Sequence, residues 1–216
     1  MSLVKRLNLN YSMNRTTNDI YTGFKPLLPD LQGWNSTHDV FRDLINRTDP
    51  ATIIEVGTWK GASAIHMADV CRSTLRKTHI YCVDTWLGAP EFWTDLAATP
   101  ERNLMQHHGY PQVYYQFISN VIHTGHQQRI TPIPNTSTTG AKILQHMGVQ
   151  AELIYIDGSH EYEDVKADIR AYLPLLKPGG VMFGDDYGWA GVHRGVLEEL
   201  PRHEVVAQNY WIYGKS

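Results

Sequence analysis

The chain has 216 residues, which is enough for one α/β domain with a buried sheet and too few for two ordinary domains joined by a linker. Its 42% apolar and 19% charged residues exclude the composition of a disordered protein. The formal net charge is −3, and the Lys and Arg residues are scattered along the chain. A basic surface is therefore not expected, and neither nucleic acid nor an anionic membrane is a predicted partner.

Targeting and membrane signals are weak. The N-terminus carries no apolar stretch behind its first charges, and no segment approaches about eighteen consecutive apolar residues. The two cysteines, Cys71 and Cys82, fall in a predicted helix and a predicted strand, so we expect free thiols rather than a disulfide. These features favour a cytoplasmic protein in a reducing compartment, and they are compatible with a homo-oligomer.

The first part of the chain differs from the rest. Residues 1–35 show no hydrophobic period but contain several aromatic residues, which predicts an N-terminal arm or lid. Residues 36–216 are predicted to form a single domain. Its first helix begins after Ser36 and ends before Pro50, because proline disfavours helical backbone in the residue before it.

From residue 52 onward, short apolar runs alternate with longer amphipathic stretches, which is typical of βαβ units and a parallel sheet. The runs are continuously apolar, as expected for strands covered by helices on both faces. A helix over 192–200 and an antiparallel hairpin formed by 205–207 and 211–213 are predicted to close one sheet edge. Residues 88–111 are an insertion and a candidate cover for the site. The predicted strands are 52–56, 80–83, 130–133, 153–156 and 181–183.

A glycine turn follows the first predicted strand. Gly57 permits a tight turn, and Gly61 lets the next helix pack close to the strand. The exposed N–H groups at a helix start favour polar or anionic ligand groups. Asp84 ends the second predicted strand, where a carboxylate can accept hydrogen bonds from both ribose hydroxyls of a nucleoside. The pattern favours nucleoside binding, with a plain structural turn as the alternative.

Two features separate this loop from that of nicotinamide oxidoreductases, which are the nearest competing interpretation. Ser63 stands where their fingerprint has a third glycine. Glu55 lies poorly beside a pyrophosphate but suits the positively charged methionine portion of S-adenosylmethionine (SAM). The charge pattern therefore favours a sulfonium cofactor.

Acidic residues follow the fourth and fifth predicted strands. Asp157 comes directly after the fourth, and Asp185 and Asp186 come soon after the fifth. If these strands are neighbours, about 4.8 Å apart, the carboxylates converge at one edge of the sheet. Clustered like charges require a cation or strongly raised pKa values, and Mg²⁺ prefers carboxylate ligands. In the alternative interpretation Asp157 only caps a helix and the Asp pair only opens a loop.

His160 lies three residues after Asp157, and we place it in the first turn of the following helix. A hydroxyl held by a metal loses its proton more easily, and a histidine can accept that proton. An exposed histidine at a helix start is the alternative. Because aromatic faces stack on sugars and phenols, the candidates for the acceptor pocket are Trp86, Trp93, Tyr187, Trp189 and His193.

These residues resemble the class I SAM-dependent methyltransferases over about residues 36–214. Residues 55–61 look like the first motif of that family, and residues 83–88 look like its ribose-binding strand end. The set Asp157-Gly158-Ser159-His160 with Asp185-Asp186 is similar to the metal-dependent macrolide sugar O-methyltransferases of the macrocin and mycinamicin type. Catechol-type relatives have a lysine at the position of His160 and an asparagine at that of Asp186.

The resemblance implies a Rossmann-like fold with a seven-stranded, mostly parallel sheet, helices on both faces and an antiparallel last strand. It implies SAM and a divalent metal, with magnesium held by the three aspartates, and a small-molecule hydroxyl acceptor such as a sugar. Metal-independent methyl transfer, a non-catalytic nucleoside-binding subunit and a nicotinamide oxidoreductase remain as alternatives. The cofactor contacts implied are Glu55, Gly57, Thr58, Gly61, Ser63, Asp84, Thr85, Trp86, Asn135, Ser137 and Asp157.

Overall fold

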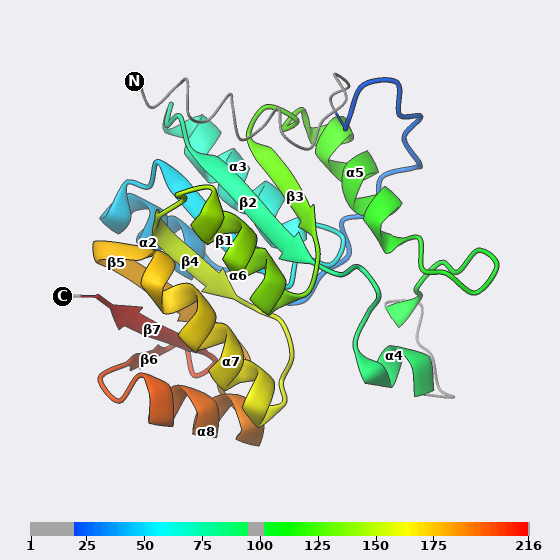
Figure 1. Cartoon of the computed structure of the whole chain (residues 1–216). Helices are drawn as coiled ribbons and strands as arrows, with labels where there is room; N and C mark the ends of the chain where they lie inside the picture. Colours follow the sequence, from blue (N-terminus) through cyan, green and yellow to red (C-terminus); the bar gives the residue numbers. More distant parts are fainter. Residues whose placement is uncertain (1–19, 95–101, 216) are drawn as a thin grey trace.

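Seven strands form one sheet in the computed structural model, which describes residues 20–94 and 102–215 (Figure 1). The strand order is β3-β2-β1-β4-β5-β7-β6, with β1 to β5 parallel and β7 antiparallel to both of its neighbours. The predicted fold class, the five apolar strands and the closing hairpin are confirmed. The strands are β1 (Thr52–Val56), β2 (His79–Asp84), β3 (Ile130–Pro134), β4 (Ala151–Ile156), β5 (Leu176–Gly184), β6 (Glu204–Val206) and β7 (Tyr210–Gly214).

Helices cover both faces of the sheet, as its uninterrupted apolar strands require. Helices α2, α3 and α5 pack on one face, and α6, α7 and α8 pack on the other (Figure 1). The helix predicted over 192–200 is confirmed as α8, which begins two residues earlier. The helices are α2 (Asp39–Thr48), α3 (Ala62–Ser73), α4 (Pro90–Thr94), α5 (Val113–Thr124), α6 (Ser137–His146), α7 (Tyr162–Tyr172) and α8 (Ala190–Glu199), with a 3-10 turn at Leu173–Leu175.

Strand alternation divides the apolar residues between two cores. On β4, Leu153 and Tyr155 enter the core beneath α2 and α3, whereas Ile154 enters the core beneath α6 and α7. Both cysteines are buried free thiols, as predicted. None of the helices in the described part of the chain is long and apolar enough to cross a membrane.

The strand order creates a crevice at the centre of the sheet. From β1 the chain continues outward to β2 and β3, and it then crosses back to β4 on the other side of β1. In open α/β sheets, ligands bind beyond the carboxyl ends of the strands at such a switch point. The loops that carry the predicted site residues all leave the sheet at this edge.

The described part of the N-terminal arm is tied to the domain. We call residues 27–36 the strap, and its backbone contacts polar side chains of α5. Leu27 N donates to Ser119 Oγ (2.9 Å), and Asp30 N donates to Asn120 Oδ1 (2.9 Å). The Asp30 carboxylate also pairs with Lys60, whose side chain is buried beside the glycine turn (2.7 Å). The strap therefore runs from α5 to the carboxyl edge of the sheet, and residues 1–19 lie outside the described part of the chain.

The insertion over 88–111 is described except for residues 95–101. It contains α4 and an isolated bridge between His107 and Tyr110. Leu104 is buried in the core beneath α5, and Phe92 packs against the same core. The described part of the insertion is thus anchored to the domain, and its role as a cover for the site stays a prediction.

Glycine substitutions test the turn geometry. Gly57 has φ +79°, and a Cβ there would lie 1.9 Å from the Asp157 carbonyl oxygen. Gly148 has φ +69° with open space around it, so it is a matched control. We expect Gly148→Ala to lower the free energy of unfolding by about 1–2 kcal/mol through left-handed backbone strain alone. Gly57→Ala should cost at least about 2 kcal/mol more because the loop must move. Urea unfolding measures both, and equal losses would contradict the close approach.

Candidate active site

The glycine turn links β1 to α3. Gly57 N donates to Val83 O (2.9 Å), which ties the turn to the end of β2. Gly61 caps α3 with φ +88°, and a Cβ at this position would lie 2.8 Å from the Phe117 ring. Both glycines are therefore required by local geometry, and the tight turn predicted between strand and helix is confirmed.

Asp84 supports this turn from the end of β2. Its Oδ2 accepts hydrogen bonds from Thr58 N (2.8 Å) and Trp59 N (2.9 Å), and its Oδ1 accepts one from Trp86 N (2.7 Å). Burial raises the pKa of Asp84, while these backbone donors act in the opposite direction. The position at the strand end is as predicted, and the ribose contact stays a prediction.

Glu55 lies beneath the turn rather than beside it. Its side chain is fully buried, and its Oε1 accepts a hydrogen bond from Ser63 on α3. Burial raises the Glu55 pKa to about 8, and the hydrogen bond from Ser63 only partly offsets this. The carboxyl group is therefore largely protonated at neutral pH, so the charge argument made from the sequence does not hold for this structure. Contacts of Glu55 and Ser63 with SAM stay predictions.

Three further residues expected to contact the cofactor occupy different environments. Asn135 N donates to Asp84 O (2.9 Å), so Asn135 lies beside the glycine turn. Ser137 begins α6, and its hydroxyl donates to Asp168 on α7, a buried carboxyl group. Thr85 is half-buried and accepts a hydrogen bond from a backbone amide through its hydroxyl. Cofactor contacts from these residues stay predictions.

Trp86 belongs to the core beneath α5. Its side chain is 2% exposed, its indole N–H donates to Trp59 O (2.7 Å), and its ring packs on Tyr114 and Phe117. The ring cannot line an acceptor pocket from this position, so that expectation is wrong. Trp93, by contrast, is half exposed on α4 and donates its indole N–H to Leu87 O (2.8 Å).

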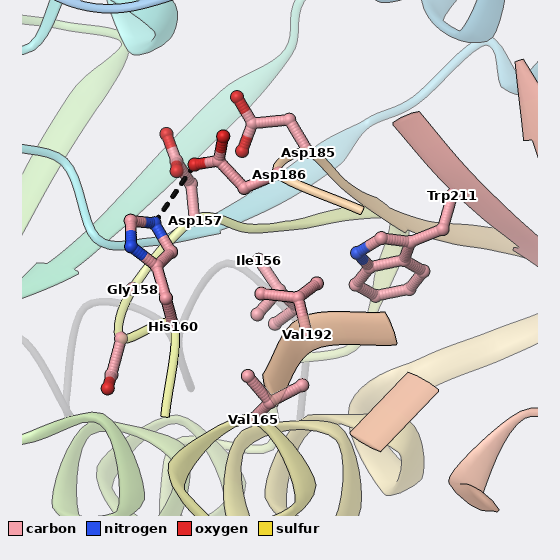
Figure 2. A pocket seen from close by; sticks show the side chains of 10 residues that line it. Ile156, Asp157, Gly158, His160, Val165, Asp185, Asp186, Val192 and Trp211 are labelled. Carbon is pink, nitrogen blue, oxygen red and sulfur yellow. Dashed lines mark ion pairs between the residues drawn. The ribbon is translucent and has the colours of Figure 1, made fainter. Parts of the chain in front are cut away.

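The acidic residues meet at the tips of β4 and β5. The two strands are paired, with Ile156 opposite Gly184, so Asp157 and Asp185 follow directly at the same edge. Asp157, Asp186 and His160 each offer a ligand atom within 4.8 Å of the others. His160 Nε2 lies 2.9 Å from Asp186 Oδ2, as drawn in Figure 2. Two of the three predicted aspartates thus converge with His160, and the third, Asp185, lies against Asp157.

The electrostatics of this edge show crowded negative charge. Burial is the main cause that raises the pKa of Asp157 well above its usual range, and the nearby Asp185 raises it further. The pKa of Asp185 is raised to about 6, mainly by burial and secondly by the nearby Asp186. Oxygen donors that repel one another are stabilised by a divalent cation, and this donor set fits Mg²⁺. The side chains therefore have the chemistry of a hard-cation site.

The alternative in which Asp157 only caps the next helix is not supported. Helix α7 begins at Tyr162, its N-cap is Glu161, and no side chain caps it. The same boundary corrects a prediction, because His160 lies in the loop before α7 and not in its first turn. Loop backbone allows the ring of His160 to turn back over the acidic edge toward Asp186.

The aromatic candidates divide into two groups. Trp189 stacks on His160, with ring centroids 4.8 Å apart and an interplanar angle of 24°, and it is 58% exposed. Tyr187 instead packs edge-on against His193, at 4.9 Å. The Tyr187 hydroxyl donates to His203, whose other ring nitrogen bonds to a backbone carbonyl. Only Trp189 is next to the acidic edge, and acceptor contacts from Tyr187 and His193 stay predictions.

A small pocket lies directly below the acidic side chains (Figure 2). Its floor is apolar and comes from four elements or their neighbouring loops: Ile156, Val165, Val192 and Trp211. Sequence reasoning did not assign any of these four to the site. The pocket combines charged oxygens with an apolar wall, as small-molecule sites commonly do.

Two polar residues near the acidic edge were also missed. The Tyr155 hydroxyl donates to Asp157 Oδ2 (3.0 Å). The Asn35 side chain, from the strap, hydrogen-bonds with Asp185. Strand periodicity could have found Tyr155, because residues two apart on a strand face the same side. No sequence signal pairs Asn35 with a residue 150 positions later.

Residues 54–187, more than half of the chain, match a family model described as a methyltransferase domain. A Streptomyces olivaceus protein named 8-demethyl-8-(2,3-dimethoxy-alpha-L-rhamnosyl)-tetracenomycin-C 4'-O-methyltransferase is 30% identical over 146 residues, covering 64% of this chain and 53% of the relative. The protein y4gI of Sinorhizobium fredii is 27% identical over 143 residues, covering 66% of this chain and 14% of the relative. The chain thus spans about half or less of these relatives.

Solved structures share the fold at low sequence identity. TomG from Streptomyces achromogenes, an O-methyltransferase crystallised with SAM, superposes with a TM-score of 0.59 at 14% identity, covering 88% of this chain and 84% of TomG. CalS11, a TDP-rhamnose 3'-O-methyltransferase, gives 0.55 at 19% identity, covering 79% and 76%. NovP, an O-methyltransferase, gives 0.56 at 15% identity, covering 82% and 78%. The sheet order, the glycine turn and the family match agree, and the chain belongs to this family of methyltransferase domains.

Proposed function

We propose that this protein transfers a methyl group from SAM to a hydroxyl group of a small-molecule acceptor. The observation that carries the proposal is the convergence of Asp157, Asp186 and His160 beside the glycine turn. Family membership supports SAM as the methyl donor. A sugar is the acceptor class we favour, because the names of the Streptomyces olivaceus relative and of CalS11 both include a rhamnose unit.

The cofactor would lie over the glycine turn. SAM supplies an electrophilic methyl group on a positively charged sulfur. The backbone at Gly57 and Gly61 allows close approach, Asp84 fixes the shape of the turn, and Asn135 lies beside it. Because the sulfonium is already reactive, the contribution expected of the protein is alignment of donor and acceptor.

The acidic edge would hold a divalent cation through Asp157, Asp185 and Asp186. A bound Mg²⁺ ion would neutralise these carboxylates and lower the pKa of an acceptor hydroxyl. The fit rests on the convergence of Asp157, Asp186 and His160, and burial together with neighbouring carboxylates raises the pKa of Asp157 and Asp185. Val192 and Trp211 give the pocket below this edge an apolar floor.

His160 is the base in this proposal. Its Nε2 faces Asp186, and its ring is held from one side by Trp189. The proton released by the acceptor hydroxyl would pass to a ring nitrogen of His160, whose positive charge the Asp186 carboxylate stabilises. The exposed face of Trp189, with Tyr187 from the loop before α8 and His193 on α8, would contact the acceptor ring.

Removing an acidic ligand tests the cation site. Asp185→Ala, and equally Asp157→Ala, should abolish metal-dependent turnover because the remaining oxygens cannot hold the ion. The affinity for S-adenosylhomocysteine, measured by calorimetry, should stay within a few-fold of wild type. Asp164→Ala, an exposed position on α7, is the control and should leave turnover unchanged. Unchanged turnover in Asp185→Ala, or full wild-type activity in a chelator, would remove the metal from the proposal.

Replacing the histidine separates a base from a ligand. His160→Ala should lower turnover by about 10²–10⁴-fold, the usual contribution of general base catalysis, while Mn²⁺ affinity is retained. His146→Ala, an exposed histidine at the end of α6, serves as the control. If Mn²⁺ affinity falls together with turnover, His160 is a metal ligand and the base must be another group.

Cofactor titration tests the proposal against its alternatives. S-Adenosylhomocysteine should bind, and NAD⁺ should not, when each is titrated calorimetrically into the protein. Binding of NAD⁺ alone would favour a nicotinamide oxidoreductase, which the family match does not support. Binding of S-adenosylhomocysteine with no turnover of any hydroxyl acceptor would favour a non-catalytic nucleoside-binding subunit.

A further inference from the structure

Tyr155 lies beneath the acidic edge and has no place in the proposed chemistry. It belongs to β4, two residues before Asp157, so both side chains point to the same face of the sheet. Its side chain is 0% exposed, and its hydroxyl donates to Asp157 Oδ2 at 3.0 Å. A phenol is protonated at neutral pH, so this contact is a hydrogen bond from a neutral donor to a carboxylate oxygen.

The ring of Tyr155 is held firmly in place. Phe183 on β5 stacks on it, with centroids 4.7 Å apart and an interplanar angle of 24°. Phe41 on α2 contacts the ring edge-on, at 5.0 Å and 79°. A donor fixed on two sides in this way restricts the rotation of the carboxylate that it contacts. The Asp157 Oδ2 atom is therefore held toward Tyr155.

The neighbouring carboxylate is restrained in a similar way. Asn35 of the strap hydrogen-bonds with Asp185 through its side chain. The Asn35 carbonyl accepts a hydrogen bond from Tyr210 on β7, at 2.9 Å, which fixes the strap at this point. Each of the two most buried aspartates at the edge thus has a neutral partner that orients it without adding charge.

We propose that Tyr155 is a positioning residue that orients Asp157 for cation binding. This inference rests on the cation site of the proposed function. Tyr155 would not contact the acceptor or the methyl group, and it would act only through Asp157. Residues that hydrogen-bond to metal ligands commonly contribute about 10–100-fold to metal affinity, because they fix the orientation of the ligand and prevent it from turning away.

Tyr155→Phe tests this role, because it removes one oxygen atom and leaves the packing of the ring with Phe41 and Phe183 intact. Mn²⁺ binding to the full chain, followed by electron paramagnetic resonance, should weaken by about 10–100-fold. S-Adenosylhomocysteine affinity should be unchanged, because the substitution removes only a buried hydroxyl whose partner is Asp157.

Tyr21→Phe is the matched control. Tyr21 is also buried, and its hydroxyl donates to Ile130 O at 2.8 Å, at the opposite end of the sheet from the acidic edge. Both variants should lower the melting temperature by a similar amount, since each loses one buried hydrogen bond. Only Tyr155→Phe should change the Mn²⁺ affinity.

The outcomes distinguish this inference from the proposed function. If wild type binds Mn²⁺, Asp157→Ala does not, and Tyr155→Phe binds it as tightly as wild type, Tyr155 has only a structural role and the inference fails alone. If wild type binds no Mn²⁺, the cation site itself fails and the inference fails with it. A loss of Mn²⁺ affinity in Tyr21→Phe equal to that in Tyr155→Phe would also overturn the inference.

Discussion

Repulsion among carboxylates at the tips of β4 and β5 is the constraint on which the site depends. The pairing of Ile156 with Gly184 brings Asp157 and Asp185 to one edge, with Asp186 next in the chain. Burial, together with the neighbouring carboxylates, raises the pKa of Asp157 and Asp185, and His160 contacts Asp186. A folded chain gains nothing from such an arrangement unless a ligand compensates it, because uncompensated buried charge is destabilising. This cost in stability supports the cation site proposed for the acidic edge.

The glycine turn and the acidic edge form one continuous site. Gly57 lies so close to the Asp157 carbonyl that there is no room for a Cβ between them, so the loops after β1 and β4 are in direct contact. A molecule over the turn and a molecule at the acidic edge would consequently be neighbours. The strap strengthens this arrangement, because Asp30 pairs with Lys60 at the turn while Asn35 reaches Asp185 at the edge. Alignment of two reactants thus follows from contacts within the fold.

Much of this arrangement could be predicted from the sequence, because its signals are local. The apolar runs correctly predicted the five parallel strands. An acidic residue that directly follows a strand could likewise be placed at the carboxyl edge of the sheet. Predictions failed where neighbours in space determine the environment. Glu55 was expected to present a charge, but burial raises its pKa to about 8. Trp86 was expected in the pocket and packs in the core, and His160 precedes its helix. Contacts from the strap and from β7, such as Asn35 and Trp211, depend on chain segments far apart and have no sequence signature.

A crystal grown with Mn²⁺ and S-adenosylhomocysteine, and measured for anomalous scattering, tests the central claim most directly. The account predicts an anomalous peak among the carboxylates of Asp157, Asp185 and Asp186, with the sulfur of S-adenosylhomocysteine on the adjoining glycine turn. A peak elsewhere, or carboxylates that face away from one another with no ion between them, would contradict the account even if the fold is unchanged.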